Sequence, residues 1–211
     1  YWGFVLIGGV VVGADALIAA AGTRSLFAPN LRAAGFQVAA LTSTTGLLTR
    51  PLYDPVFGGL SRQLFLLFML VGACAGSTGG GLKMMRAMVL ARVGLRELRR
   101  ATVPGQAVTP LIVDGKIVED AQVSRVAALA VGMLMIIGLA ALAVAEFERL
   151  GAIEAFSVAL SAVNNAGPAL IAPQRIAAFS GGLKMVLAAV MFVGRLEVFP
   201  VVALLSRRTW R

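Results

Sequence analysis

The sequence contains no histidine and a single cysteine, Cys74, among 211 residues. Without histidine, a Ser-His catalytic pair and most protein metal sites cannot be built. One cysteine excludes a disulfide within the chain. Paired carboxylates within the apolar segments are missing as well, and an acid-base hydrolase inside a membrane would need them. We therefore expect that the protein is not an enzyme and that this chain carries no cofactor.

Charged side chains are also scarce. Only 14% of the residues are charged and 59% are hydrophobic, whereas soluble domains usually carry about 25% charged residues. This composition predicts an integral membrane protein in contact with the lipid bilayer. The net charge of +9 is then typical of cytoplasmic loops near anionic headgroups, and no nucleic-acid partner is expected. Because the chain starts at Tyr1, with no Met and no basic segment before the apolar run, we expect a piece of a longer polypeptide.

Four apolar segments can be distinguished. Residues 2–21, interrupted only by Asp15, and residues 126–145, which have no charge, are long enough to cross about 30 Å of hydrocarbon. Residues 64–75 are too short to cross alone and run into a glycine cluster. The fourth segment, residues 185–205, is long enough but contains Arg195, Glu197 and Pro200.

Two weaker segments, residues 31–43 and 153–163, are half a membrane long, and a glycine-containing turn follows each (TTGLLT and NNAGPAL). They are either ordinary interfacial helices or re-entrant half-helices, and the turns favour the second interpretation. The chain then reads as two repeats, residues 1–90 and 123–211, joined by a basic cytoplasmic linker, residues 91–122. The predicted fold is all-α and integral to the membrane: each repeat has a transmembrane helix, a re-entrant pore helix with a filter loop, and a second transmembrane helix.

The arginines predict how the repeats are oriented. By the positive-inside rule, the linker and the C-terminus both face the cytoplasm, which makes the two repeats parallel. The arginines that carry this argument are Arg92, Arg96, Arg99, Arg100, Arg207, Arg208 and Arg211. The rule is not obeyed everywhere, since four further arginines fall on the outer side: Arg24, Arg32, Arg50 and Arg62.

The paired turns suit a cation. Half-helices that point their C-terminal ends at the membrane centre place partial negative charge there. Extended residues after each helix can then turn carbonyl oxygens toward an axis, and such carbonyls replace the hydration shell of a monovalent cation. Under the repeat Gly46 and Gly167 are equivalent, and the predicted filter residues are Thr44, Thr45, Gly46, Leu47, Asn165, Ala166, Gly167 and Pro168. Two turns cannot form a fourfold ring, so either two more lie in sequence before Tyr1 or two chains combine.

Four motifs together resemble a known family. GACAGSTGGGLKMMR, TSTTGLLT, NNAGPAL and VGRLEVFPVVALL are similar, in order and spacing, to the Trk/Ktr/HKT superfamily of potassium transporters, and to its bacterial TrkH-like membrane subunits in particular. This resemblance implies a multi-pass cell-membrane protein that takes up potassium, with this chain as the third and fourth of four pore repeats. It also implies a homodimer and a cytosolic nucleotide-binding regulatory subunit. Potassium, the transported substrate, would bind at Thr44, Thr45, Asn165 and Ala166.

Two residues depart from the family's pattern. Leu47 stands where an aromatic is common after the filter glycine, and Arg50 stands where polar or acidic residues are usual. Both departures bear on the outer ion site and leave the architecture unchanged.

The glycine cluster predicts a deliberate break in the third apolar segment. Five glycines fall within ten residues, and each costs about 1 kcal/mol relative to alanine inside a helix. The alternatives are a GxxxG packing face formed by Gly72, Gly76 and Gly80 and a phosphate-binding loop, whose Gly-Lys-Ser/Thr ending is absent. The resemblance implies that the cluster is an intramembrane gate below the filter. The predicted gate residues are Gly76, Ser77, Thr78, Gly79, Gly80, Gly81, Lys83 and Arg195.

Several charged residues keep two interpretations. Arg195 lies in an apolar segment, where a charge normally faces a pore, although pairing with Glu197 or snorkelling would also explain it. Lys83 is either a gate residue or the first cytoplasmic charge, and Asp15 fits helix packing better than an ion site. Glu146, Glu148 and Glu154 form an outer acidic cluster that either concentrates cations or is simply a solvated loop.

A secondary transporter with broken helices, for another small cation-coupled substrate, is the main alternative function. Inverted repeats would favour it, whereas parallel repeats favour the pore. A purely structural membrane scaffold gives no reason for two glycine turns. The residues alone leave open potassium against sodium selectivity and a channel against coupled symport.

Overall fold

The computed structural model describes residues 2–19, 27–73, 80–100, 112–113, 116–117 and 120–196. The described helices confirm the predicted α-helical fold class. The strands add only a two-residue-by-two-residue antiparallel hairpin between α4 and α5, with Ile112 opposite Ile117 and Val113 opposite Lys116. In chain order the elements are α1 (Trp2–Ala19), α2 (Phe27–Thr42), α3 (Gly59–Leu70), α4 (Met84–Arg100), β1 (Ile112–Val113), β2 (Lys116–Ile117), α5 (Asp120–Glu148), α6 (Ala152–Asn164), α7 (Pro173–Ala177) and α8 (Gly181–Leu196).

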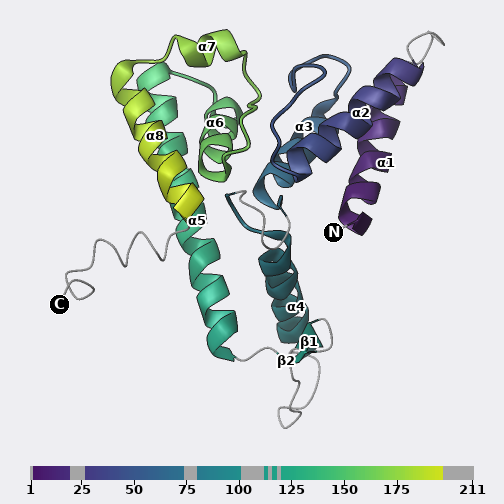
Figure 1. Ribbon diagram of the computed structural model, residues 1–211, viewed down its shortest axis with the longest axis vertical. Helices are drawn as coiled ribbons and strands as arrows, with labels where there is room; N and C mark the ends of the chain where they lie inside the picture. Colours follow the sequence, from purple (N-terminus) through teal and green to yellow (C-terminus); the bar gives the residue numbers. More distant parts are fainter. Residues whose placement is uncertain are drawn as a thin grey trace.

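The helices form two groups of the same design. Helices α1, α2 and α3 contact one another, as do α5, α6 and α8, while α3 with α6 and α4 with α5 join the groups. In Figure 1, α1 and α5 run upward, α2 and α6 return downward to the centre, and α3 and α8 run downward. The two repeats therefore have the same orientation. The inverted arrangement, which would have favoured a broken-helix secondary transporter, is not observed.

Two described helices, α1 and α5, are long and apolar enough to cross a membrane. Helices α3 and α6 are apolar but shorter, as expected for segments that do not span the bilayer alone. On α1 the buried face consists of small residues, Gly8, Val12, Gly13 and Ala16, while apolar side chains of the other face, such as Leu6 and Ile7, are exposed. Exposed apolar side chains on such a helix are suited to contact with lipid.

One buried cluster holds the two repeats together. Phe65, Phe68 and Met69 of α3 belong to the same apolar core as Ile137 of α5 and Leu160 of α6. The aromatic ring of Phe68 packs edge-on against Phe4 of α1, with ring centroids 5.2 Å apart. Helix α3 is thus shared between the repeats, and its C-terminal end lies at the centre of the molecule.

The predicted break in the third apolar segment is present. Helix α3 ends at Leu70 and α4 begins at Met84, and we call the interval between them, residues 71–83, the helix break. Ala73 has a left-handed backbone (φ 63°), and its carbonyl accepts a hydrogen bond from the amide of Met84 at 3.2 Å. The two sides of the helix break therefore meet directly.

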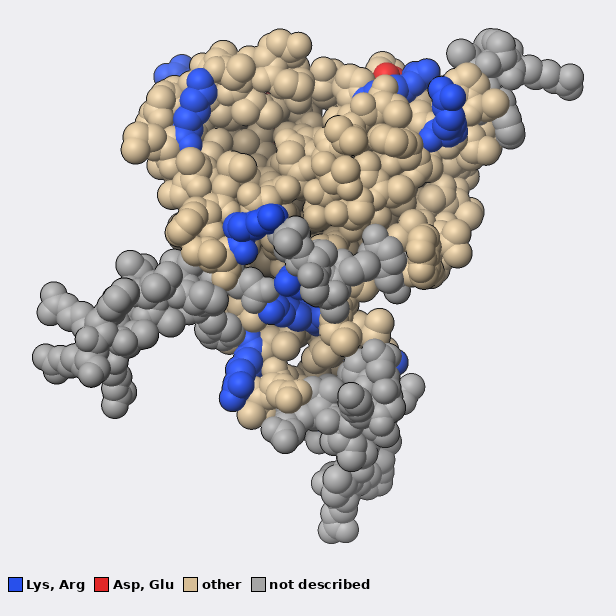
Figure 2. All heavy atoms as spheres, in the orientation of Figure 1, with Lys and Arg blue, Asp and Glu red and all other residues tan. Residues whose placement is uncertain are grey.

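Helix α4 runs ten residues into the stretch that the sequence suggested as a linker, since it continues to Arg100. The helix is amphipathic: apolar residues such as Val89 pack toward α5, while Arg92 is exposed. Arg96 joins α4 to the start of α5 through an ion pair with Asp120 at 3.4 Å. Figure 2 shows lysines and arginines both over this lower half and along the upper edge, so positive charge is present at both ends of the helices.

Candidate functional site

The two predicted filter turns follow the half-helices α2 and α6, and we call residues 44–47 the first turn and residues 165–168 the second turn. In the first turn, the amide of Thr44 donates to the carbonyl of Leu41 at 3.2 Å and that of Thr45 donates to Ala40 at 3.0 Å. Thr44 has a left-handed backbone, with φ 54°. This pair of bonds around a left-handed residue is the Schellman ending of a helix.

The second turn repeats this ending bond for bond. The amide of Asn165 donates to Ala162 at 3.2 Å and that of Ala166 donates to Ser161 at 3.0 Å. Asn165 also has φ 54°. All of these pairs are related by the offset that relates Gly46 to Gly167, 121 residues. The sequence repeat is therefore a repeat of backbone geometry at the candidate site.

The glycine of each turn has a backbone that other residues rarely adopt, with φ 75° at Gly46 and 95° at Gly167. The two turns also touch each other. A Cβ on Gly46 would collide with the carbonyl oxygen of Ala166, while a Cβ on Gly167 would lie 3.8 Å from the Cα of Gly46. The structure thus brings together the predicted filter residues of both repeats.

Hydroxyl groups surround the first turn. The side chains of Ser43 and Thr45 hydrogen-bond each other at 2.7 Å, and the hydroxyl of Thr44 donates to the carbonyl of Ser43 at 2.7 Å. Thr45 and Leu47 are exposed in this chain. In the second turn Ala166 and Pro168 are buried and Asn165 is half-buried, so the two turns differ in their side chains although their backbones agree.

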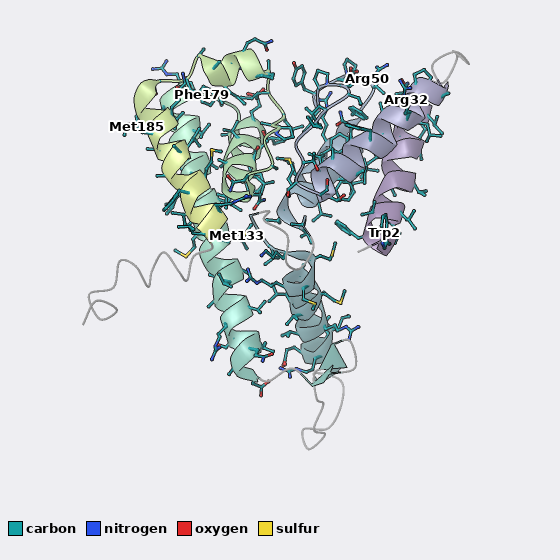
Figure 3. All side chains as sticks on the ribbon, in the orientation of Figure 1. Trp2, Arg32, Arg50, Met133, Phe179 and Met185 are labelled. Carbon is teal, nitrogen blue, oxygen red and sulfur yellow. The ribbon has the colours of Figure 1, made fainter. Side chains whose placement is uncertain are left out.

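In each repeat, a polar side chain of the half-helix forms a hydrogen bond with the segment that follows the turn. In the first repeat the amide of Gln37, on α2, donates to the carbonyl of Arg50. In the second, the hydroxyl of Ser157, on α6, accepts a hydrogen bond from the amide of Leu170 at 3.0 Å. The outgoing chains line a common pocket of about 300 Å³ above the turns, and Figure 3 shows Arg50 and Phe179 at this same upper end, one on each repeat.

Arg50, one of the departures from the family's pattern, lies beside a carboxylate. Its guanidinium is 3.8 Å from the carboxylate of Asp54. The positive charge at this outer position is therefore partly offset by a neighbour four residues along the chain.

Below the turns, glycines allow other segments to approach the C-terminal ends of the half-helices. Gly72 packs on the end of α2, where a Cβ would lie 3.3 Å from the carbonyl oxygens of Leu41 and Thr42. Gly80 packs in the same way on α6, where a Cβ would lie 2.9 Å from the carbonyl oxygen of Val163. Gly72 and Gly80 therefore do not lie on one face of a helix, as the GxxxG interpretation requires. Each of them does allow a close approach, but to a different half-helix.

The gate residues are only partly described. Gly76, Ser77, Thr78 and Gly79 lie outside the described residues. Lys83 directly precedes α4, and its carbonyl accepts a hydrogen bond from the amide of Arg86 at 2.8 Å. Gly80 and Gly81 flank the end of α6.

Arg195 lies in the last turn of α8 as described, with an exposed side chain, and Glu197 lies outside the described residues. Gly194, the residue before Arg195, brings α8 close to α6, because a Cβ there would collide with the carbonyl oxygen of Val163. The sequence contains the signal for this contact in VGRLE, but its packing role was not predicted.

Asp15 caps a helix, in line with the packing interpretation. Its carboxylate accepts hydrogen bonds from the amides of Gly58 at 3.0 Å and Ser61 at 3.3 Å, and from the hydroxyl of Ser61. These amides open α3, where the helix dipole favours a negative charge. A carboxylate from α1 thus serves as the N-cap that the residue before α3, Gly58, cannot supply.

The outer carboxylates have local partners. Glu148 accepts from the amide of Ser180, at the start of α8, at 2.8 Å, and Glu154 is 3.9 Å from Arg175. Within the described part of the chain, no group of three or more His, Cys, Asp or Glu side chains is placed to hold a metal ion. Glu148 and Glu154 therefore make local contacts that neither interpretation of the acidic cluster included.

Parallel repeats of helix, half-helix, turn and helix, with the two turns in contact, define a class of helical membrane proteins with re-entrant segments at their centre. A family model described as a cation transport protein, TrkH, matches residues 27–209. The chain belongs to this TrkH family.

Relatives within the family are uptake proteins. The chain is 32% identical over 190 residues to the Trk system potassium uptake protein TrkH of Salmonella typhimurium, covering 86% of this chain and 37% of that protein. It is 33% identical to the Trk system potassium uptake protein TrkI of Halomonas elongata, over 83% of this chain and 36% of that protein. The crystal structure of the potassium transporter TrkH from Vibrio parahaemolyticus matches with a TM-score of 0.82 and 28% identity, over 99% of this chain and 43% of that one. The chain thus spans little more than a third of the length of these curated relatives.

Proposed function

We propose that this chain forms part of a potassium uptake pathway across the cell membrane, in which carbonyl oxygens of the first and second turns contact the passing ion. The observation that carries the proposal is the identical Schellman geometry of the two turns together with the contact between Gly46 and Ala166. Two half-helices that end side by side create a centre of partial negative charge, which suits a cation.

The chemistry of the turns favours a monovalent cation. Backbone carbonyls and threonine hydroxyls are uncharged oxygen ligands, which can replace water around potassium without holding it too tightly to leave. Thr44 and Thr45 in the first turn, with Asn165 and Ala166 in the second, are the proposed contacts. The names of the relatives, which are potassium uptake proteins, support potassium as the ion.

A ring around the ion needs more than two turns. We propose that residues 1–90 and 123–211 are two pore repeats joined by the linker 91–122, and that further repeats outside these 211 residues complete the ring. The share of the relatives that the chain covers, 37% in the Salmonella protein, leaves room for them. The remaining assignments of the family, a homodimer with a cytosolic nucleotide-binding regulatory subunit in a multi-pass membrane protein, are part of the same proposal.

The helix break and Arg195 are the proposed gate. Arg195 and the described end of the helix break lie below the turns: Gly80 packs against the end of α6, and Arg195 follows Gly194 at the same end. A positive side chain here would raise the barrier to a cation that passes without its full hydration shell.

Rubidium uptake tests the proposal. The complete protein, reconstituted in proteoliposomes, should take up rubidium, and potassium should compete more strongly than sodium. Liposomes without protein are the control. Equal competition by sodium and potassium would contradict the potassium assignment, and no uptake by correctly inserted protein would contradict the transport function itself.

A further inference from the structure

Asn164 is the last residue of α6, directly before the second turn, and its side chain is 0% exposed. It was not among the predicted gate residues, nor among the predicted filter residues, which in the second repeat begin at Asn165. Its amide reaches across to the other repeat, to residues 95 positions away in the chain. A fully buried carboxamide at a junction between repeats is costly unless it is satisfied, so its contacts indicate what it does.

The carboxamide completes the end of α3. In a continuous helix the carbonyl of Met69 would accept from the amide of Ala73, but Ala73 donates instead to the carbonyl of Thr42 at the end of α2, at 2.8 Å. The side-chain nitrogen of Asn164 takes the vacant place and donates to Met69 at 2.6 Å. At the helix break, one helical hydrogen bond is thus replaced by two others. Ala73 donates to the end of α2, and Met69 accepts from the end of α6.

The other side of the carboxamide faces the far side of the helix break. Among the described residues, the oxygen of Asn164 is buried and accepts no hydrogen bond. A Cβ on Gly81 would collide with this oxygen, and Gly81 has φ 86°. One side chain thus touches Met69, before the helix break, and Gly81, after it.

Among the described residues, the first repeat shows no such contact. The residue equivalent to Asn164 under the offset is Ser43, whose side chain is exposed and donates to the carbonyl of Ala39 at 2.7 Å, in the half-helix that it directly follows. Helix α8, the counterpart of α3, continues to Leu196 without a break as described. The buried carboxamide therefore occurs at the half-helix that meets the broken helix.

We propose that Asn164 is a positioning residue that couples the second turn to the helix break. Its amide fixes the end of α6, and hence the carbonyls of the second turn, relative to both sides of the break. A displacement of Gly81 or Met69 then moves the second turn, and an ion held in the turns favours one arrangement of the break. The inference rests on the proposed function, since it assigns ion contact to the second turn.

The test compares three variants of the complete protein: Asn164→Leu, which keeps the side-chain size without the amide, Asn164→Ala, and Gly81→Ala. Two quantities are measured, the rubidium concentration that gives half-maximal uptake and the shift of the melting temperature caused by potassium. With Asn164→Leu we expect the half-maximal concentration to rise about tenfold and the potassium-induced shift to shrink, while maximal uptake per folded molecule changes much less. Unchanged values of both quantities would overturn the inference.

Asn30→Leu is the matched control, because Asn30 is also a buried asparagine on a half-helix (2% exposed), with a buried side-chain oxygen that accepts no hydrogen bond among the described residues. Its replacement should alter stability but leave the half-maximal concentration unchanged, and an equal rise in both variants would overturn a specific role for Asn164. The effect of Gly81→Ala on that concentration should be smaller in the Asn164→Ala background, where the colliding oxygen is absent, and full additivity would contradict the coupling. Rubidium uptake by the unaltered protein decides the proposed function separately.

Discussion

The Cα of Gly46 lies against the carbonyl oxygen of Ala166, so closely that no side chain fits between them. The contact joins equivalent turns of two repeats that are far apart in the chain. It requires glycine twice over, because Gly46 also has φ 75°, where a Cβ costs about 1–2 kcal/mol. The relationship between these residues therefore restricts the backbone at the centre of the proposed pathway.

We expect Gly46→Ala to weaken potassium selectivity more than Gly167→Ala. Both substitutions strain a backbone with positive φ, but only the Cβ on residue 46 collides with a neighbouring carbonyl. Sodium competition of rubidium uptake should reveal a loss of discrimination of about tenfold for Gly46→Ala, which corresponds to about 1.4 kcal/mol, and a smaller loss for Gly167→Ala. Equal discrimination in both variants and the unaltered protein would show that these turns do not contact the ion.

Gly194→Ala should separate α8 from α6. The added Cβ would collide with the carbonyl oxygen of Val163, a backbone atom at the end of a buried helix. Overpacking of this kind costs about 1–3 kcal/mol, and the melting temperature of the purified protein should fall. Gly182→Ala is the control on the same helix, because a Cβ there meets nothing within 4 Å. A Gly194→Ala variant as stable as Gly182→Ala would contradict the close approach.

Asp15→Ala should destabilise the protein by removing the cap of α3. Hydrogen bonds to a charged group contribute about 1.5–3 kcal/mol, and the amides of Gly58 and Ser61 would lose their acceptor. Asp15→Asn keeps an oxygen acceptor but not the charge, so we expect a smaller decrease in melting temperature. If Asp15→Asn were as unstable as Asp15→Ala, the charge rather than the acceptor would be responsible.

Arg195→Ala should raise cation flux per correctly inserted molecule. At an effective dielectric constant near 20, like charges about 6 Å apart repel by roughly 3 kcal/mol, so the increase could approach a hundredfold. Lys184→Ala is the matched control, since Lys184 is a cation on the same helix but at its other end, where it donates to the carbonyl of Ala177. Unchanged or lower flux with Arg195→Ala in a well-folded protein would remove this residue from the gate.

A deletion tests the remaining part of the gate. Removing residues 76–79 leaves Gly80 and Gly81, which pack on α6, and should raise flux if this segment obstructs the pathway. A deletion that extended to Gly81 would also remove a contact with Asn164 and would confound the result. Loss of flux with normal stability in the shorter deletion would contradict the gate.

Local composition was sufficient to predict much of the fold. Apolar runs predicted the spanning helices, glycine cost predicted a break in the third apolar segment, and the repeated turns predicted that Gly46 and Gly167 are equivalent. Each of these signals lies within a few residues of the feature it predicts, and each depends on the backbone rather than on a partner.

The contacts between segments could not be predicted in the same way. Nothing near Asn164 in the sequence indicates that its amide bonds to Met69, 95 residues away, and Gly194 shows its role only once α8 lies against α6. The extent of α4 beyond residue 90 was missed because its arginines are typical of a cytoplasmic linker, although the same stretch also has the pattern of an amphipathic helix.

The hydrogen bond between Met84 and Ala73 has a consequence for how the protein can be dissected. This bond holds the start of α4 against the end of the segment after α3 without the peptide chain between the two residues. In addition, α3 shares one apolar core with α5 and α6. Fragments produced by cutting the chain between Ala73 and Met84 should therefore reassociate when expressed together. The protein could then be studied as two complementary fragments, one with the first turn and the other with the second turn.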